Sequence, residues 1–234
     1  MSVRNLLCID ASSNVCSLAA QSASGVFSVS EDQAGSHASS LMALLDGILE
    51  DAQLSPEVLD GIVYGCGPGS FTGVRIGIAL AQGLAHGAQI KMLPVSSLRN
   101  IAQQWFDKYP DDDVVDVAID ARMGEWYVSR CTRDARGIAN TVGEEVLAEP
   151  GPWLSTRDAQ TPVYVGIAAL DDAQRQLAQV RKLRLTVGLA APSARTALAI
   201  AQTADVADWH AAETAAASYV RDKVAQTIAE RETR

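Results

Sequence analysis

The stretch 61–87 constrains the fold more than any other, because it joins a strand signal, a glycine-rich turn and a long helix signal. Residues 62–64 are typical of the end of a buried strand bounded by glycines. The glycines and the proline that follow predict a tight turn, since glycine adopts positive φ without steric cost. The residues of this turn motif are Gly65, Gly67, Pro68, Gly69, Ser70 and Thr72. We expect Ser70 or Thr72 to cap the next helix, its side-chain oxygen accepting from a backbone N–H.

The helix predicted over 72–86 is apolar or small around most of its circumference. One ridge has only small residues at a spacing of four: Gly73, Gly77, Ala81 and Ala85. Its flanks are Ile76, Leu80 and Leu84 on one side and Val74 and Ile78 on the other, and the polar stripe is Arg75, Gln82 and His86. The apolar arc spans roughly 220°, about twice the stripe that one core contact uses. We therefore expect one face to pack on its own sheet, and the small ridge to admit a helix of another protein.

Two other interpretations of this stretch stay open. The helix can pack wholly inside its own fold, and a glycine-rich turn before a helix N-terminus can bind phosphate. The known phosphate motifs do not fit, however. A P-loop needs a lysine, and none stands between Asp51 and Ile90. A dinucleotide fingerprint needs glycine at Ser70 or Thr72, and a nucleophile elbow at Ser70 needs glycine at Pro68 and Thr72.

The composition predicts an acidic globular protein. Its 234 residues carry a formal net charge of −9, so if the chain acts on RNA, a partner is expected to supply most of the phosphate contacts. The basic cluster at 175–184 is interpreted as solvated surface. We expect a cytoplasmic protein without membrane contact, because no apolar run approaches ~20 residues and no secretory leader pattern is present. The cysteines lack the paired spacing of zinc or redox motifs, and they are Cys8, Cys16, Cys66 and Cys131.

The rest of the chain predicts alternating strands and helices. Strands are expected at 6–10, 15–20, 25–30, 114–120, 126–131 and 163–166, and helices at 37–53, 97–109, 173–180 and 192–204. The segment 137–162 has few secondary-structure signals and is interpreted as loop-rich.

A strand–Asp–turn–strand unit occurs twice in the sequence. The first unit contains Asp10 and the second Asp120, each within the tripeptide Ile-Asp-Ala. This repetition suggests two related α/β halves, although a shared tripeptide can also arise by chance. The proline and charge run after Tyr109 predict the boundary. We expect a first lobe at 1–109, a second at 110–217, and a tail at 218–234 that completes the first lobe.

Residues 67–77, read as Gly-Pro-Gly-Ser-Phe-Thr-Gly-Val-Arg-Ile-Gly, closely resemble the motif of the TsaB family, also called YeaZ. The likeness covers nearly the whole chain, including the segment 119–127 and the terminal 219–221. It is looser at 37–41, where the family usually has an acidic residue at Ser40. The resemblance implies an α/β, two-lobed actin/sugar-kinase-like (ASKHA) fold, in which each lobe holds one of the duplicated mixed sheets.

The resemblance also implies a function. TsaB-like proteins help to install threonylcarbamoyl (t6A) on adenosine 37 of tRNAs that read ANN codons, together with the catalytic paralogue TsaD and the ATPase TsaE. It implies a non-catalytic scaffold and activator that forms a homodimer without TsaD, whereas ATP is used by the complex. Its first two helices would meet TsaD, through interface residues Leu41, Leu45, Ile48, Gly73, Val74, Gly77, Ile78, Ala81 and Ala85.

Catalysis by this chain alone would need a constellation of residues that the sequence lacks. Its histidines, His37, His86 and His210, are isolated, so we expect no metal. Asp10 and Ser12 are candidates for nucleotide binding or for capping a structural turn, and Asp120 and Arg122 could form a local ion pair. Two enzyme classes stay as alternatives, an ATP-dependent small-molecule kinase of the same fold and a metallopeptidase.

Overall fold

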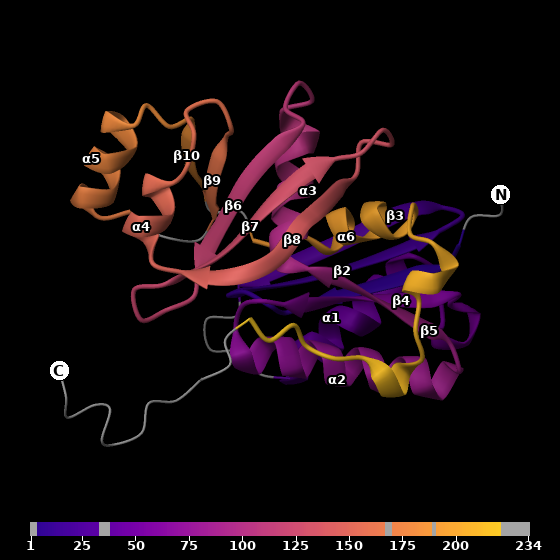
Figure 1. Cartoon of the computed structure of the whole chain (residues 1–234). Coiled ribbons are helices and arrows are strands. Elements are labelled where there is room, and N and C mark those ends of the chain that lie inside the picture. Colours follow the sequence, from indigo (N-terminus) through magenta and orange to yellow (C-terminus); the bar gives the residue numbers. More distant parts are fainter. Residues whose placement is uncertain (1–3, 33–37, 167–169, 189–190, 221–234) are drawn as a thin grey trace, which may run out of the picture.

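The computed structural model describes residues 4–32, 38–166, 170–188 and 191–220 (Figure 1). The strands of the first sheet are β1 (Leu6–Asp10), β2 (Val15–Ser22), β3 (Gly25–Asp32), β4 (Gly61–Gly67) and β5 (Lys91–Ser96). Those of the second sheet are β6 (Val114–Asp120), β7 (Trp126–Arg133), β8 (Ala139–Ala148), β9 (Val163–Gly166) and β10 (Leu185–Gly188). The α-helices are α1 (Ala38–Asp51), α2 (Phe71–Ala88), α3 (Ser97–Lys108), α4 (Pro150–Ser155), α5 (Asp172–Val180) and α6 (Ala194–Ala201), and the short 3₁₀ turns are η1 (Pro56–Val58), η2 (Val206–Asp208) and η3 (Ala212–Thr214).

The two sheets repeat one topology. The first has the order β3-β2-β1-β4-β5, and the second has the order β8-β7-β6-β9-β10. In each sheet the central strand pairs antiparallel with the next strand of the chain and parallel with the one that follows the first crossover. This correspondence confirms the α/β fold of two lobes with duplicated mixed sheets, and it places both Ile-Asp-Ala units at the ends of the equivalent strands β1 and β6.

Strand β1 lies at the centre of its sheet because its side chains are apolar on both faces. Leu7 and Ile9 pack into the cluster that contains α1 and α2, whereas Leu6 and Cys8 pack into the cluster that contains α6. All five residues of β1 are buried, as expected for a strand covered by helices on both sides. Figure 1 shows α1 and α2 below the first sheet and α6 above it.

Each sheet is also covered by a helix that follows the other sheet in the chain. Helix α3 follows β5 but packs on the second sheet, where Leu98 and Ile101 meet Val115 and Val117. Helix α6 follows β10 but packs on the first sheet. The predicted boundary at Tyr109 stays a prediction, but residues 194–217 pack on the first sheet rather than the second. Each sheet packs against a helix from the other half of the chain because its apolar face must be buried by some element, whatever the position of that element in the sequence.

The sequence analysis did not predict three of the strands and one of the helices. Strands β8 and β5 are edge strands and β10 has only four residues, while helix α4 follows β8 directly. The segment 137–162, predicted to be loop-rich, contains both β8 and α4. Its signal is weak because Val142 and Val146 are exposed and Gly143 has a φ of +75°. Strand β5 contains Pro94, a residue that is rare within strands, so its signal is weak as well.

The chain returns to the first lobe after α6. Residues 204–220, which we call the C-terminal strap, pair with β5 through Met92 and His210 and bury Trp209 against Gly61. The strap then follows α2 in the direction opposite to the chain of the helix (Figure 1). The predicted contact of 218–220 with the first lobe is present, and 221–234 lie outside the described residues.

Candidate functional site

The turn after β4 brings the start of α2 onto the first hairpin. Gly67 has a φ of +87°, which disfavours any residue with a side chain. Ser70 is the N-cap of α2, and its Oγ accepts a hydrogen bond from Gly73 N at 3.2 Å. The expectation of a capping hydroxyl is therefore confirmed for Ser70, whereas Thr72 lies exposed in the first turn of the helix.

The glycines of this stretch are needed for close approach within the chain. A Cβ atom at Gly65 would overlap the carboxylate of Asp10, and one at Gly69 would overlap the carbonyl oxygen of Ser12. A Cβ atom at Gly73 would overlap the carbonyl oxygen of Ala11. The glycine pattern thus fits the turn and the helix directly against the β1–β2 hairpin.

The small ridge of α2 is therefore buried inside the monomer. Gly77 lies 3.5 Å from the Ala11 Cβ atom, measured from the Cβ position that a side chain would occupy, and Ala81 and Ala85 are fully buried. This corrects the predicted interface, because all nine of its residues belong to the core of the first lobe: Leu41, Leu45, Ile48, Gly73, Val74, Gly77, Ile78, Ala81 and Ala85. Small side chains admit β1 to the helix, so they are not available to a partner.

The polar stripe of α2 carries the C-terminal strap. Nη2 of Arg75 donates to the Tyr219 hydroxyl at 2.9 Å, and Nε2 of Gln82 donates to the carbonyl oxygen of Ala212 at 2.9 Å. At the far end of the helix, His86 Nδ1 lies 3.3 Å from Oε1 of Glu213. The polar stripe of α2 is thus occupied by the chain itself.

One flank of α2 stays open once the sheet and the strap are in place. It spans roughly 100° at 3.6 residues per turn and consists of Thr72, Ile76, Ala79, Leu80, Gly83 and Gly87, none of which is fully buried. A Cβ atom at Gly83 or Gly87 would meet nothing within 4 Å. The exposed side of α1 adds Met42, Ala43 and Gly47. We call these nine residues the α1/α2 face. It is a partly apolar, small-residue surface that the described part of the chain leaves uncovered.

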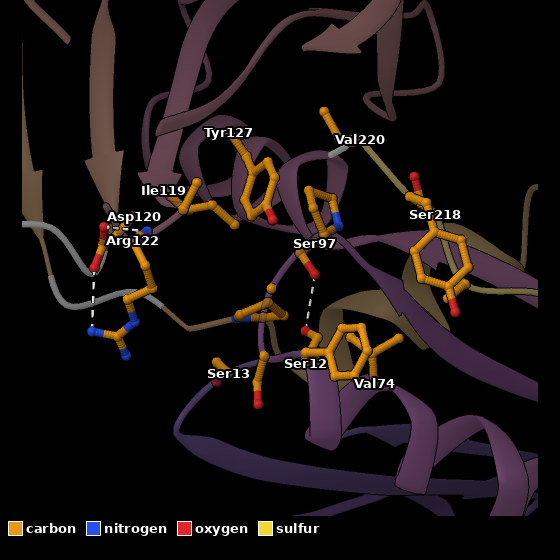
Figure 2. A pocket seen from close by; sticks show the side chains of 18 of the residues that line it. Ser12, Ser13, Val74, Ser97, Ile119, Asp120, Arg122, Tyr127, Ser218 and Val220 are labelled. Carbon is orange, nitrogen blue, oxygen red and sulfur yellow. Dashed lines mark hydrogen bonds and ion pairs between the residues drawn. The ribbon is translucent and has the colours of Figure 1, made fainter. Parts of the chain in front are cut away.

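A cavity of about 550 Å³ lies between the two lobes. Figure 2 shows Ser12, Ser97 and Val74 from the first half of the chain opposite Ile119 and Arg122 from the second half. Its polar lining includes Ser12, Ser13, Ser70, Arg75, Asp120 and Arg122. Its apolar lining includes Phe71, Ile101, Met123, Tyr127 and Tyr219. The cavity is large enough for a ligand of small-molecule size.

Asp10 caps the first hairpin turn and is buried beneath it. Its Oδ1 accepts hydrogen bonds from Ser12 N at 2.9 Å and from Ser12 Oγ at 2.6 Å. Its Oδ2 is buried and has no hydrogen-bond partner among the described residues. Burial raises the pKa of the Asp10 carboxyl above its ordinary value, and the hydrogen bonds from Ser12 oppose this shift. The structural role proposed for Asp10 is therefore present. Nucleotide binding by Asp10 and Ser12 stays a prediction, although Ser12 lines the cavity.

The second hairpin has the equivalent local interaction. Asp120 Oδ1 accepts from Arg122 N at 2.8 Å, and Asp120 Oδ2 lies 3.4 Å from Nη1 of Arg122. This is the local ion pair anticipated from the sequence. Arg122 has a φ of +67°, and it lines the cavity together with Asp120.

The described histidines, which were considered as metal ligands, contact other residues of the chain, and the four cysteines, considered for zinc or redox motifs, are buried. His86 pairs with the strap, His210 packs edge-on against Tyr64, and His37 lies outside the described residues. Across the described ranges, no three His, Cys, Asp or Glu side chains converge as a metal site would need. All four cysteines are buried, and burial raises the pKa of the Cys66 thiol to about 12. No helix among the described residues has the length and apolarity to cross a bilayer.

The sequence reading missed the rim of the cavity. Arg75 lies over the Phe71 ring, with its guanidinium carbon 3.3 Å from the ring centroid, and it holds Tyr219 from the strap. Met123 from the second lobe lines the same cavity. The pairing of Arg75 with Tyr219 joins residues that are far apart in the chain, so no local pattern could reveal it.

The chain is similar to proteins of known families along most of its length. A family model described as tRNA N6-adenosine threonylcarbamoyltransferase, TsaD, matches residues 19–230. The TsaB protein of Haemophilus influenzae, described as a tRNA threonylcarbamoyladenosine biosynthesis protein, is 33% identical over 188 residues, which cover 80% of this chain and 74% of the relative. Escherichia coli TsaB is 39% identical over 145 residues, which are 62% of each protein.

Solved structures agree with the sequence relatives. YeaZ from Pseudomonas aeruginosa superposes with a TM-score of 0.76 at 30% identity, over 94% of this chain and all of that one. Another Pseudomonas aeruginosa structure, titled an uncharacterized protein with similarity to peptidase YEAZ, has a TM-score of 0.78 at the same identity and coverage. The chain therefore belongs to the TsaB (YeaZ) family of tRNA threonylcarbamoyladenosine biosynthesis proteins.

Proposed function

We propose that the chain is a non-catalytic subunit of the t6A machinery, which binds TsaD through the α1/α2 face and activates it. The observation that carries this proposal is the open flank of α2. Ile76 and Leu80 on this flank are only partly buried. Gly83 follows them in the helix, and a Cβ atom placed there would have open space around it. A surface of apolar and small residues allows another helix to approach closely, with the backbones separated by less than usual.

The first hairpin supports a role without phosphate chemistry. Proteins that bind phosphate on such turns direct free backbone amides at it. Here Ser12 N donates to Asp10, and Val15 N donates to the Ser13 hydroxyl. Ser70 N, at the start of α2, donates to the carbonyl oxygen of Ser12 at 2.7 Å. These three amides are already engaged inside the protein, which disfavours an ATP-dependent kinase reaction in this cleft.

The remaining parts of the proposal follow from the family role. The chain would work in the cytoplasm, reach TsaE through the complex with TsaD, and contact tRNA mainly through TsaD. ATP would be consumed by the complex, and the chain would need no metal or cofactor of its own. A homodimer through the same α1/α2 face would form when TsaD is absent.

The test is complex formation with purified TsaD, followed by size-exclusion chromatography and calorimetry. Gly83→Leu places a large side chain on the open flank, and it is expected to weaken binding about tenfold or more, since overpacking typically costs about 1–3 kcal/mol. Gly151→Leu is the matched control, because Gly151 lies in α4 with open space above it. Gly77→Leu cannot serve here, because it would disturb the core against Ala11 and Ile9.

Unchanged binding of TsaD by Gly83→Leu would contradict the assignment of the face. Turnover of ATP by the isolated chain would contradict the non-catalytic role and favour the kinase alternative. Hydrolysis of peptides by the isolated chain, abolished by chelators, would favour the metallopeptidase alternative instead.

A further inference from the structure

The C-terminal end of α5 carries a group of basic side chains in a chain that is acidic as a whole. Residues 173–204 contain five basic and no acidic side chains, whereas the whole chain has 28 Asp and Glu against 19 Lys and Arg. Three of these basic residues are exposed and lie on α5 or directly after it, and they are Arg175, Arg181 and Lys182. We call them the α5 basic patch. Such a local excess of positive charge attracts polyanions even when the net charge is negative.

The charge of the α5 basic patch is not neutralised within the described part of the chain, where none of its three residues forms an ion pair. The neighbouring Arg184 differs, because its Nη1 and Nη2 atoms contact Asp112 at 3.0 and 3.2 Å. The acidic side chains of α5 stand at the opposite end of the helix, where Asp171 is the N-cap and Asp172 follows it. The patch is therefore available to a negatively charged partner.

The side chains around the patch are hydrogen-bond donors. Arg175 and Gln179 lie one helical turn apart and share a face of α5. The backbone N–H of Lys182 donates to the carbonyl oxygen of Gln179 at 3.0 Å, so the turn after the helix holds Lys182 next to this face. Nη2 of Arg181 donates to the carbonyl oxygen of Arg157 at 2.9 Å, which orients a guanidinium group that has further N–H donors. These donors suit a ligand that offers many acceptor oxygens and negative charge.

The patch is remote from the α1/α2 face. Figure 1 shows α5 beyond β9 and β10, on the side of the second lobe that points away from α1 and α2. A protein bound to the α1/α2 face would therefore leave the α5 basic patch accessible to a second partner.

We propose that the α5 basic patch contacts the phosphate backbone of tRNA. The choice of RNA among polyanions rests on the proposed function in t6A modification, whereas the charge and the donors belong to the patch itself. Cations that pair with phosphates bind without regard to base sequence and fix the orientation of the nucleic acid. The patch thus positions a tRNA whose bases are recognised elsewhere, and it adds to the contacts that TsaD makes.

The test is titration of fluorescently labelled tRNA with the full-length chain, followed by fluorescence anisotropy at several salt concentrations. Arg175→Glu with Lys182→Glu is expected to weaken binding about tenfold or more at ~50 mM salt. It should also make the slope of log K against log salt shallower by about 1.5, because each phosphate contact contributes about 0.7–0.9 to that slope. Arg4→Glu with Lys91→Glu is the matched control, since both residues are exposed in the first lobe and the net charge changes equally.

The control variant is expected to bind tRNA nearly as well as the parent chain. Absence of tRNA binding by the parent, equal affinity of the parent and the patch variant, or equal weakening in the control would each overturn the proposal. Binding of phosphatidylserine vesicles through the patch without binding of tRNA would also overturn it, because the patch would then serve a membrane surface. Complex formation with TsaD should be the same for all variants, so this measurement separates a failure of the patch from a failure of the proposed function. Circular dichroism of each variant excludes loss of folding as the cause of weaker binding.

Discussion

Two glycines of the same helix are expected to respond in opposite directions to one added methyl group. A Cβ atom at Gly73 would overlap the backbone carbonyl oxygen of Ala11, whereas one at Gly83 would meet nothing within 4 Å. Gly83→Ala should stabilise the protein by about 1 kcal/mol, the helix preference of alanine over glycine. Gly73→Ala should destabilise it by about 1–3 kcal/mol, because the overlapping atom belongs to the backbone and cannot rotate away.

The assay is urea unfolding of both variants and the parent chain under identical conditions, monitored by circular dichroism. A change of 1 kcal/mol corresponds to about 2–4 °C in Tm for a domain of this size, so thermal scans provide a second measurement. Gly77→Ala is the internal control, since its new Cβ atom would make ordinary contacts at 3.5 Å or more. Equal stability of the Gly73→Ala variant and the parent would refute the argument that the glycines admit the hairpin to α2, and the α1/α2 face would then have to be redefined.

Three further perturbations test the packing around this framework. Asp116 is fully buried and pairs with Arg130 and Arg157, so Asp116→Ala should lower the free energy of unfolding in urea by about 3–5 kcal/mol. Asp120 forms an exposed pair, so Asp120→Ala should lower it by less than about 1 kcal/mol. Similar losses of stability for the two variants would contradict this contrast. The raised pKa of buried Asp10 means that the folded chain holds this proton to higher pH than the unfolded chain, so its contribution to stability is lost as pH rises above the ordinary carboxyl range. Asp10→Asn should therefore gain stability relative to the parent between pH 4 and pH 7 in urea titrations at each pH, and parallel curves would refute the shift. Gln82→Ala removes two hydrogen bonds to the strap and should raise the rate of limited proteolysis at 212–220, with unchanged cleavage counting against the anchoring role.

The local patterns predicted much of the first lobe correctly. The run of apolar residues at 6–10 specified a buried strand, and the Gly-Pro-Gly turn with Ser70 specified a capped helix. The repeat of Ile-Asp-Ala predicted two equivalent units, which the shared strand order confirms. The edge strand β8 was missed because several of its residues are exposed and it lacks the apolar alternation that identifies a strand, whereas β5 is largely buried but contains Pro94, which is atypical of a strand.

The features of the candidate site likewise divide into those that the sequence predicts and those that depend on the tertiary structure. The sequence by itself determined that α2 is apolar over more of its surface than one contact needs, because side-chain type and helical spacing are local properties. Only the tertiary structure decided which side is free, since Gly73 and Gly77 meet the first hairpin while Gln82 meets the strap from a distant part of the chain. The rim formed by Phe71, Met123 and Tyr219 likewise depends on how the lobes and the strap come together, which no short-range pattern encodes.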